Sequence, residues 1–103
     1  MESKVIGGKM YDTKTAEVIG SFANTHDKRD FQYCSETLYR KHTGEFVLYG
    51  EGGPLSLYCE EVGRNEWGYG SSIIPMSEAA AKEWAEEHLT GEKYVEIFGP
   101  VEE

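Results

Sequence analysis

The fold is decided by residues 31–50, FQYCSETLYRKHTGEFVLYG, in which two alternating segments flank a turn at Thr43-Gly44. Successive side chains of a strand point to opposite faces, and residues 31–43 fit that pattern. One face would carry Tyr33, Ser35, Thr37 and Tyr39, and the other Cys34, Glu36, Leu38 and Arg40. Residues 45–50 return as the second strand. The short glycine-containing turn predicts an antiparallel hairpin.

Further strands are expected on both sides of this hairpin. The turn residues Asp12-Thr13-Lys14 favour a first hairpin, in which Tyr11 pairs with a strand that begins at Thr15. After the central hairpin, residues 55–60 and 67–74 have the composition of strands. Pro75 should end the sheet, because proline has no N–H to donate to a neighbouring strand.

Helical sequence begins at Ser77, whose hydroxyl can cap the first turn of a helix. The run EAAAKEWAEEHL that follows consists mostly of good helix formers. Its apolar face would carry Ala81, Trp84, Ala85 and His88, which recur at spacings of three and four. Thr90 can cap a second, shorter helix over residues 91–98.

Strands followed by helices predict a single α+β domain over residues 1–103. We expect an antiparallel sheet of about five strands, a C-terminal helix packed on one of its faces, and a short terminal helix.

The glycine-rich segment Gly50-Glu51-Gly52-Gly53-Pro54 raises the question of a phosphate loop. Such a loop needs a lysine and the start of a helix, whereas here a strand is expected and Glu51 would repel phosphate. The segment also lacks the dinucleotide-binding fingerprint. We expect it to be a bend between two strands, with glycines that adopt positive φ.

The charge of the chain is concentrated in its second half. Residues 1–50 carry seven acids and seven bases, whereas residues 51–103 carry twelve acids and three bases, which accounts for the whole net charge of −9. An acidic chain is a poor ligand for nucleic-acid phosphates, so direct nucleic-acid binding is disfavoured. The asymmetry has two interpretations, a solvated helical surface or an acidic face that meets a basic partner.

Other function classes leave few signals. No apolar run approaches the roughly 20 residues of a membrane helix, and the start MESKVIGGKMYD lacks the apolar region of a signal peptide. We therefore expect a cytoplasmic protein that binds no membrane, with Cys34 and Cys59 reduced. No spacing indicates a metal site, a cofactor or a catalytic dyad, so neither metal nor cofactor is expected.

Aromatic residues exceed what one small core needs, with seven tyrosines and two tryptophans in 103 residues. Tyrosine and acid in one patch are typical of protein-binding surfaces. The candidate protein-binding residues are Tyr58, Glu60, Glu61, Glu66, Tyr69, Glu83, Glu86 and Glu87. The expected partner is a protein with a basic surface. A dimer interface is the alternative use of the same residues.

The stretches YDTKTAEVIG, ETLYRKHTGEFVLYGEGG, IIPMSEAAAKEWAEEHL and YVEIFG resemble a family of small, uncharacterised proteins carried by phages and mobile elements of Gram-positive bacteria. The resemblance spans residues 9–99 and implies a genomic setting rather than an activity. In that setting, small acidic proteins often inhibit host machinery, as anti-CRISPR proteins do when they occupy DNA-binding channels.

Three hypotheses follow. The first is a non-enzymatic acidic module of phage or mobile-element origin that inhibits a nucleic-acid-handling or defence protein of the host. The second is a structural or regulatory homo-oligomer without inhibitory activity. The third, ranked last, is a small enzyme that uses Cys34 or Cys59.

Overall fold

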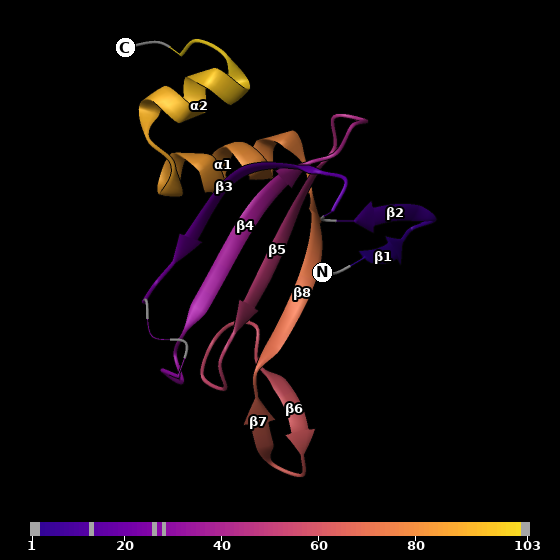
Figure 1. The fold of residues 1–103 in the computed structure, drawn as a ribbon, viewed down its shortest axis with the longest axis vertical. Helices are drawn as coiled ribbons and strands as arrows, with labels where there is room; N and C mark the ends of the chain where they lie inside the picture. The colour runs from indigo at the N-terminus through magenta and orange to yellow at the C-terminus, as the bar shows by residue number, and fades with distance from the viewer. Residues whose placement is uncertain (1–2, 13, 26, 28, 102–103) are drawn as a thin grey trace.

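The computed structural model describes residues 3–12, 14–25, 27 and 29–101. Its centre is a four-stranded antiparallel sheet with the order β3-β4-β5-β8 (Figure 1). These strands are β3 (Glu17–Ala23), β4 (Cys34–Arg40), β5 (Phe46–Gly52) and β8 (Gly70–Met76). Two helices follow the strands, so the predicted α+β class is confirmed.

The hairpin predicted in residues 31–50 is present as β4 and β5. Leu38 faces Leu48 in the register, and Gly44 makes the turn with a φ of 90°. The first strand, expected over residues 31–43, is shorter at both ends and spans Cys34–Arg40. Residues 31–32 form a turn instead, and the Phe31 carbonyl oxygen accepts from Leu55 N–H of the β5–β6 loop over 2.8 Å. The second strand is longer and runs on to Gly52.

The expected bend at Gly50 is wrong. Gly50 and Gly52 lie inside β5, and neither they nor Gly53 adopt positive φ. These glycines instead permit close approach. A Cβ on Gly50 would overlap the Tyr58 ring, and one on Gly53 would stand 2.7 Å from the Phe31 carbonyl oxygen. Lack of a side chain, rather than conformational freedom, is what this segment requires.

The first hairpin also differs from the expectation. It joins β1 (Ser3–Ile6) to β2 (Lys9–Asp12) through Gly7 and Gly8, which have φ of 59° and 80°. Two glycines with positive φ suit a tight two-residue hairpin. The turn expected at Asp12 includes Thr13, which lies outside the described residues. Asp12 does accept a hydrogen bond from Lys14 N–H over 2.8 Å.

The segments after β5 are divided differently from the prediction. Most of residues 55–60 form turns, and a small separate hairpin, β6 (Glu60–Gly63) with β7 (Glu66–Gly68), extends from one end of the sheet. The strand expected over residues 67–74 is broken at Tyr69. Pro75 does not end the sheet, because β8 is an edge strand that continues to Met76.

Both helices begin at the predicted caps. The Ser77 hydroxyl accepts from Ala80 N–H at the start of α1 (Glu78–His88), and Thr90 accepts from Lys93 N–H at the start of α2 (Gly91–Phe98). The α1 helix buries Ala81, Trp84 and Ala85. The main core also contains Ile19, Leu38, Phe46 and Leu48 of the sheet.

A second, smaller core lies on the opposite face of the sheet. Tyr11 of the β1–β2 hairpin packs there with Val47 and Ile73, and Tyr39 and Tyr49 lie against them. Residues of β5 alternate between the two cores, since Leu48 belongs to the first and Val47 to the second.

Candidate functional site

The eight predicted binding residues divide into separate places. Six are glutamates, and all six are exposed. Glu60, Glu61 and Glu66 lie on the β6–β7 hairpin, whereas Glu83, Glu86 and Glu87 lie on α1. The hairpin and α1 lie toward opposite ends of the long axis of the molecule (Figure 1). The structure therefore does not join these carboxylates into one acidic face.

Tyr58 is placed inside the protein rather than on its surface. It is 7% exposed, and its hydroxyl donates to one carboxylate oxygen of Glu36. The other oxygen of Glu36 accepts from the Trp84 indole N–H over 3.0 Å. Burial, followed by the hydrogen bond to Glu36, raises the pKa of Tyr58 above its ordinary value. Tyr58 therefore ties the β5–β6 loop to β4 and cannot serve as the surface anchor expected from the sequence.

The β6–β7 hairpin and its neighbours form a surface that we call the tip. Apolar side chains are unusually exposed there: Trp67 by 56%, Val62 by 63% and Leu57, in the preceding loop, by 83%. Glu60, Glu61, Glu66 and Tyr69 complete this surface, and Tyr69 is 46% exposed. Residues 60–68 contain three acids and a single base, Arg64.

A groove continues from the tip onto the sheet. It has a volume of about 460 Å³ and lies between the β5–β6 loop and β8, with Leu57, Ser72 and Ile74 in its lining. Leu57 and Val62 were not identified from the sequence as site residues. The sequence feature that could have identified them is an apolar residue in each of two short, turn-rich segments, where it is not required for the core face of a strand or helix.

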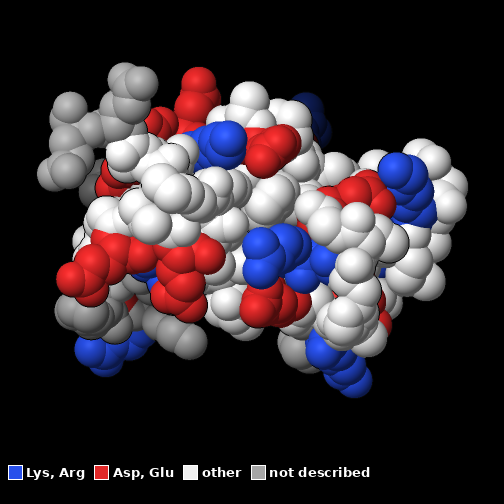
Figure 2. Space-filling model, turned by 90° about the horizontal axis from the view of Figure 1, so that it is seen from above, with Lys and Arg blue, Asp and Glu red and all other residues white. Residues whose placement is uncertain are grey.

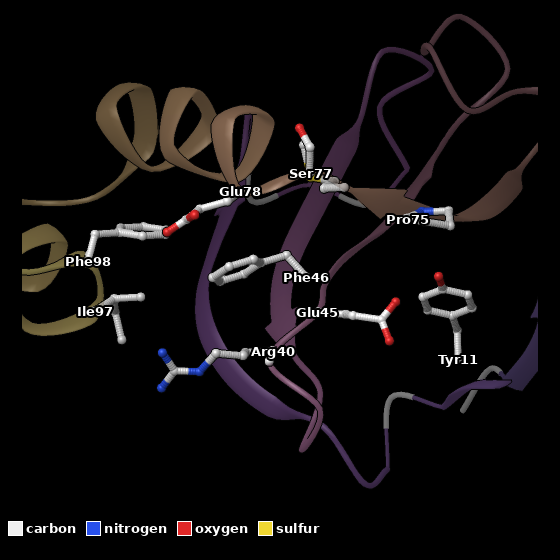
Figure 3. A pocket seen from close by; sticks show the side chains of 11 residues that line it. Tyr11, Arg40, Glu45, Phe46, Pro75, Ser77, Glu78, Ile97 and Phe98 are labelled. Carbon is white, nitrogen blue, oxygen red and sulfur yellow. The ribbon is translucent and has the colours of Figure 1, made fainter. Parts of the chain in front are cut away.

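A cavity of about 690 Å³ lies at the other end of the sheet. Phe46 stands at its centre, between Phe98 of α2 and Tyr11 of β2 (Figure 3). Its volume suits a small molecule, but its charged groups already have partners. Arg40 pairs with Glu17 at 2.6 Å, and Glu45 pairs with Lys9 at 3.1 Å.

The carboxylates on the helices are partly balanced by neighbouring bases. Glu78 lies 3.8 Å from Lys82, and Glu96 lies 3.8 Å from Lys93. Seen from the helical end, acidic side chains form separate groups with Lys and Arg among them (Figure 2). Among the described residues of the two helices, no aromatic side chain is as exposed as Trp67 and Tyr69 of the tip.

Cys34 is one of the two cysteines of the enzyme hypothesis. Burial and the charge of Glu36 raise the pKa of the Cys34 thiol, which disfavours the nucleophilic thiolate. No three ligands of suitable type are grouped among the described residues. None of the described helices has the length and apolar character needed to cross a bilayer.

Comparisons of the chain with models of protein families, with curated proteins and with solved structures give no significant match. Function must therefore be inferred from the surface of the molecule itself.

Proposed function

We propose that this protein is a non-enzymatic binding module whose tip docks on a basic protein surface. The observation that supports this most is the combination of exposed Trp67, Val62 and Leu57 with an excess of carboxylates. Exposed apolar side chains are a cost in water unless another surface covers them. Aromatic anchors surrounded by polar groups are typical of binding hot spots.

The charge of the tip favours a basic partner. Glu60, Glu61 and Glu66 outnumber Arg64 on the hairpin, and all four are exposed. Carboxylates around an apolar centre attract lysine and arginine at a distance and repel acidic surfaces. The partner surface should therefore present basic groups around apolar side chains.

The same chemistry suits an inhibitor of a nucleic-acid-handling or defence protein. Such proteins carry basic surfaces for phosphate, and the sequence resemblance implies a phage or mobile-element setting. In this proposal the tip covers part of that basic surface and excludes nucleic acid. The helix carboxylates lie far from the tip and make no contact with the partner in this proposal.

Selection from a random peptide library tests the proposal with the full chain. The protein, held through its C-terminus, is exposed to a displayed library of random twelve-residue peptides. We expect selected peptides to combine lysine or arginine with tryptophan or leucine. Selection of peptides with no excess of basic residues would contradict the proposal.

Two matched triple variants locate the binding surface. One carries Glu60→Gln, Glu61→Gln and Glu66→Gln, and the control carries the same change at Glu83, Glu86 and Glu87 on α1. The tip variant should bind the selected peptides at least about ten-fold more weakly, whereas the control should stay within about two-fold. The reverse order would move the binding surface to the helix.

A homo-oligomer is the second candidate. The exposed Lys4 of the β1–β2 hairpin, an element that lies away from the tip, offers a basic contact to the acidic tip of a second copy. Light scattering at several concentrations decides this candidate. A mass equal to one chain throughout would reject self-association.

A further inference from the structure

A second concentration of aromatic side chains surrounds Glu51, near the end of β5. Because successive side chains of a strand point to opposite faces, Glu51 lies on the sheet face of Val47 and Tyr49. This face is opposite to the one that α1 covers. In the register it lies between Ser35 of β4 and Ser71 of β8. The surrounding backbone is regular sheet, so this carboxylate is held on a rigid support.

Tyrosines approach Glu51 from several elements. The Tyr49 hydroxyl lies 3.4 Å from its carboxylate, and the Tyr69 phenol is close enough for the charge of Glu51 to act on it. The ring of Tyr33 stacks on that of Tyr69, with centroids 6.4 Å apart and planes 15° apart. Burial and the charge of Glu51 raise the pKa of Tyr69 to about 12, so its hydroxyl remains a neutral donor at physiological pH.

The other end of β5 shows what such an arrangement can hold. There, the Lys41 ammonium lies 4.2 Å from the centroid of the Tyr11 ring and 3.5 Å from a carboxylate oxygen of Glu45. A cation is thus bound between an aromatic ring and a carboxylate. Glu51 offers the same two kinds of group, yet no Lys or Arg among the described residues pairs with it.

We propose that Glu51, Tyr49 and Tyr69 form a recognition site for an arginine side chain of the protein partner. This inference rests on the proposed function, because Tyr69 belongs to the tip and directly follows β7. A partner seated on Trp67 and Val62 would be close enough to extend one side chain over Tyr69. The site therefore specifies one residue of the partner's basic surface.

Arginine fits this site better than lysine. Its planar guanidinium can stack on a tyrosine ring while it donates two parallel hydrogen bonds to one carboxylate. The phenol hydroxyls use only part of the accepting capacity of Glu51, since a carboxylate has about four lone-pair positions. The half-buried Glu51 also gains from a paired cation, because a desolvated carboxylate is stabilised by opposite charge.

An NMR titration with N-acetyl-arginine amide tests the site directly. The uniformly labelled full chain should show saturable shifts at Glu51 and in the rings of Tyr49 and Tyr69. N-acetyl-lysine amide should produce the same shifts more weakly, and N-acetyl-glutamine amide should produce none. Arginine shifts confined to Glu60, Glu61 and Glu66, with none at Glu51, would overturn the inference.

Variants separate this site from the rest of the tip. Glu51→Gln should weaken the binding of N-acetyl-arginine amide at least about ten-fold. The control Glu92→Gln, at an exposed position of α2, should change this binding by no more than about two-fold. If circular dichroism shows that Glu51→Gln is unfolded, Tyr69→Ala takes its place, since Tyr69 is exposed. Unchanged binding by the folded variant would overturn the inference.

The two proposals fail in different ways. The triple glutamine variant of the tip should lose the selected peptides but still bind N-acetyl-arginine amide at Glu51. If no arginine binds at Glu51 and the selected peptides still require the tip, the arginine site is rejected and the proposed function stands. If arginine binds at Glu51 but the tip variant keeps its peptides, the proposed function is rejected.

Discussion

At the scale of single residues, Glu36 connects three parts of the chain. Its two carboxylate oxygens accept from Tyr58 of the β5–β6 loop and from Trp84 of α1. Both donors are buried, so loss of the acceptor would leave two polar groups without partners. The sequence showed a strand glutamate and a helix tryptophan, but the bond between them depends on how α1 lies on the sheet.

Glu36→Ala should lower the free energy of unfolding by roughly 2–3 kcal/mol, because two buried donors lose a charged acceptor. Urea denaturation followed by circular dichroism measures the change. Glu86→Ala on the exposed side of α1 is the control and should cost less than about 0.5 kcal/mol. Equal losses for the two variants would show that the bonds to Glu36 contribute no net stability.

Gly50 provides the second prediction. Gly50→Ala should cost roughly 1–3 kcal/mol, because its Cβ would overlap the Tyr58 ring. Gly91→Ala is the control: no atom lies within 4 Å of that Cβ, and a helix favours alanine over glycine. In a Tyr58→Ala background, the cost of Gly50→Ala should fall by about 1 kcal/mol or more. Purely additive costs would contradict the contact.

At the scale of elements, a buried ring and an ion pair help to hold the β1–β2 hairpin to the sheet. Tyr11 enters the smaller core, and Lys9 reaches Glu45 at 3.1 Å. The hydrogen bond from Lys9 lowers the pKa of Glu45 below its ordinary value. The pair therefore stabilises the folded hairpin above the ordinary glutamate range and is lost as the pH falls through the lowered pKa.

Amide hydrogen exchange across β1 and β2 tests this pH dependence. Corrected for intrinsic rates, protection of these amides should fall as the pH passes below the ordinary glutamate range, while β4 and β5 keep theirs. Glu45→Gln should have weaker protection at neutral pH and little further change on acidification. An acid response that persists in Glu45→Gln would assign the effect to another carboxyl group.

At the scale of the whole molecule, the acidic second half is split between the tip and the helices. The molecule is 49 Å long, and the two groups lie toward its opposite ends. They are therefore separated by much more than the Debye length of about 8 Å at physiological salt. Under the proposed function, each group therefore acts almost independently on the partner. Local apolar contact at the tip, rather than total charge, is what distinguishes one acidic end from the other.

Binding of the selected basic peptides should weaken as salt rises from about 0.05 to 0.5 M, because screening reduces attraction to the tip. The change should appear mainly in the association rate, measured by surface plasmon resonance. The triple glutamine variant of the tip should show a smaller salt dependence than the triple variant of α1. Affinity that does not change with salt would contradict an electrostatic contribution.

The α+β class, the β4–β5 hairpin and both helix caps could be predicted, because each depends on nearby residues. Alternation marks β4, and hydroxyls at Ser77 and Thr90 accept from the first turns of their own helices. The position of the first hairpin could not be predicted, because Gly7-Gly8 competes with Asp12-Thr13-Lys14 as a turn and the sequence does not rank them. Nor could the end of the sheet near Pro75, because a sequence does not show which strand is an edge.

The sequence by itself determined the charge, its concentration in residues 51–103, and the order of strands and helices. Only the tertiary structure decided that Tyr58 is buried, that the carboxylates separate into two groups, and that tyrosines converge on Glu51. The physical reason is range. Turns, caps and alternation arise from contacts within a few residues, whereas a surface is assembled from segments brought together by folding.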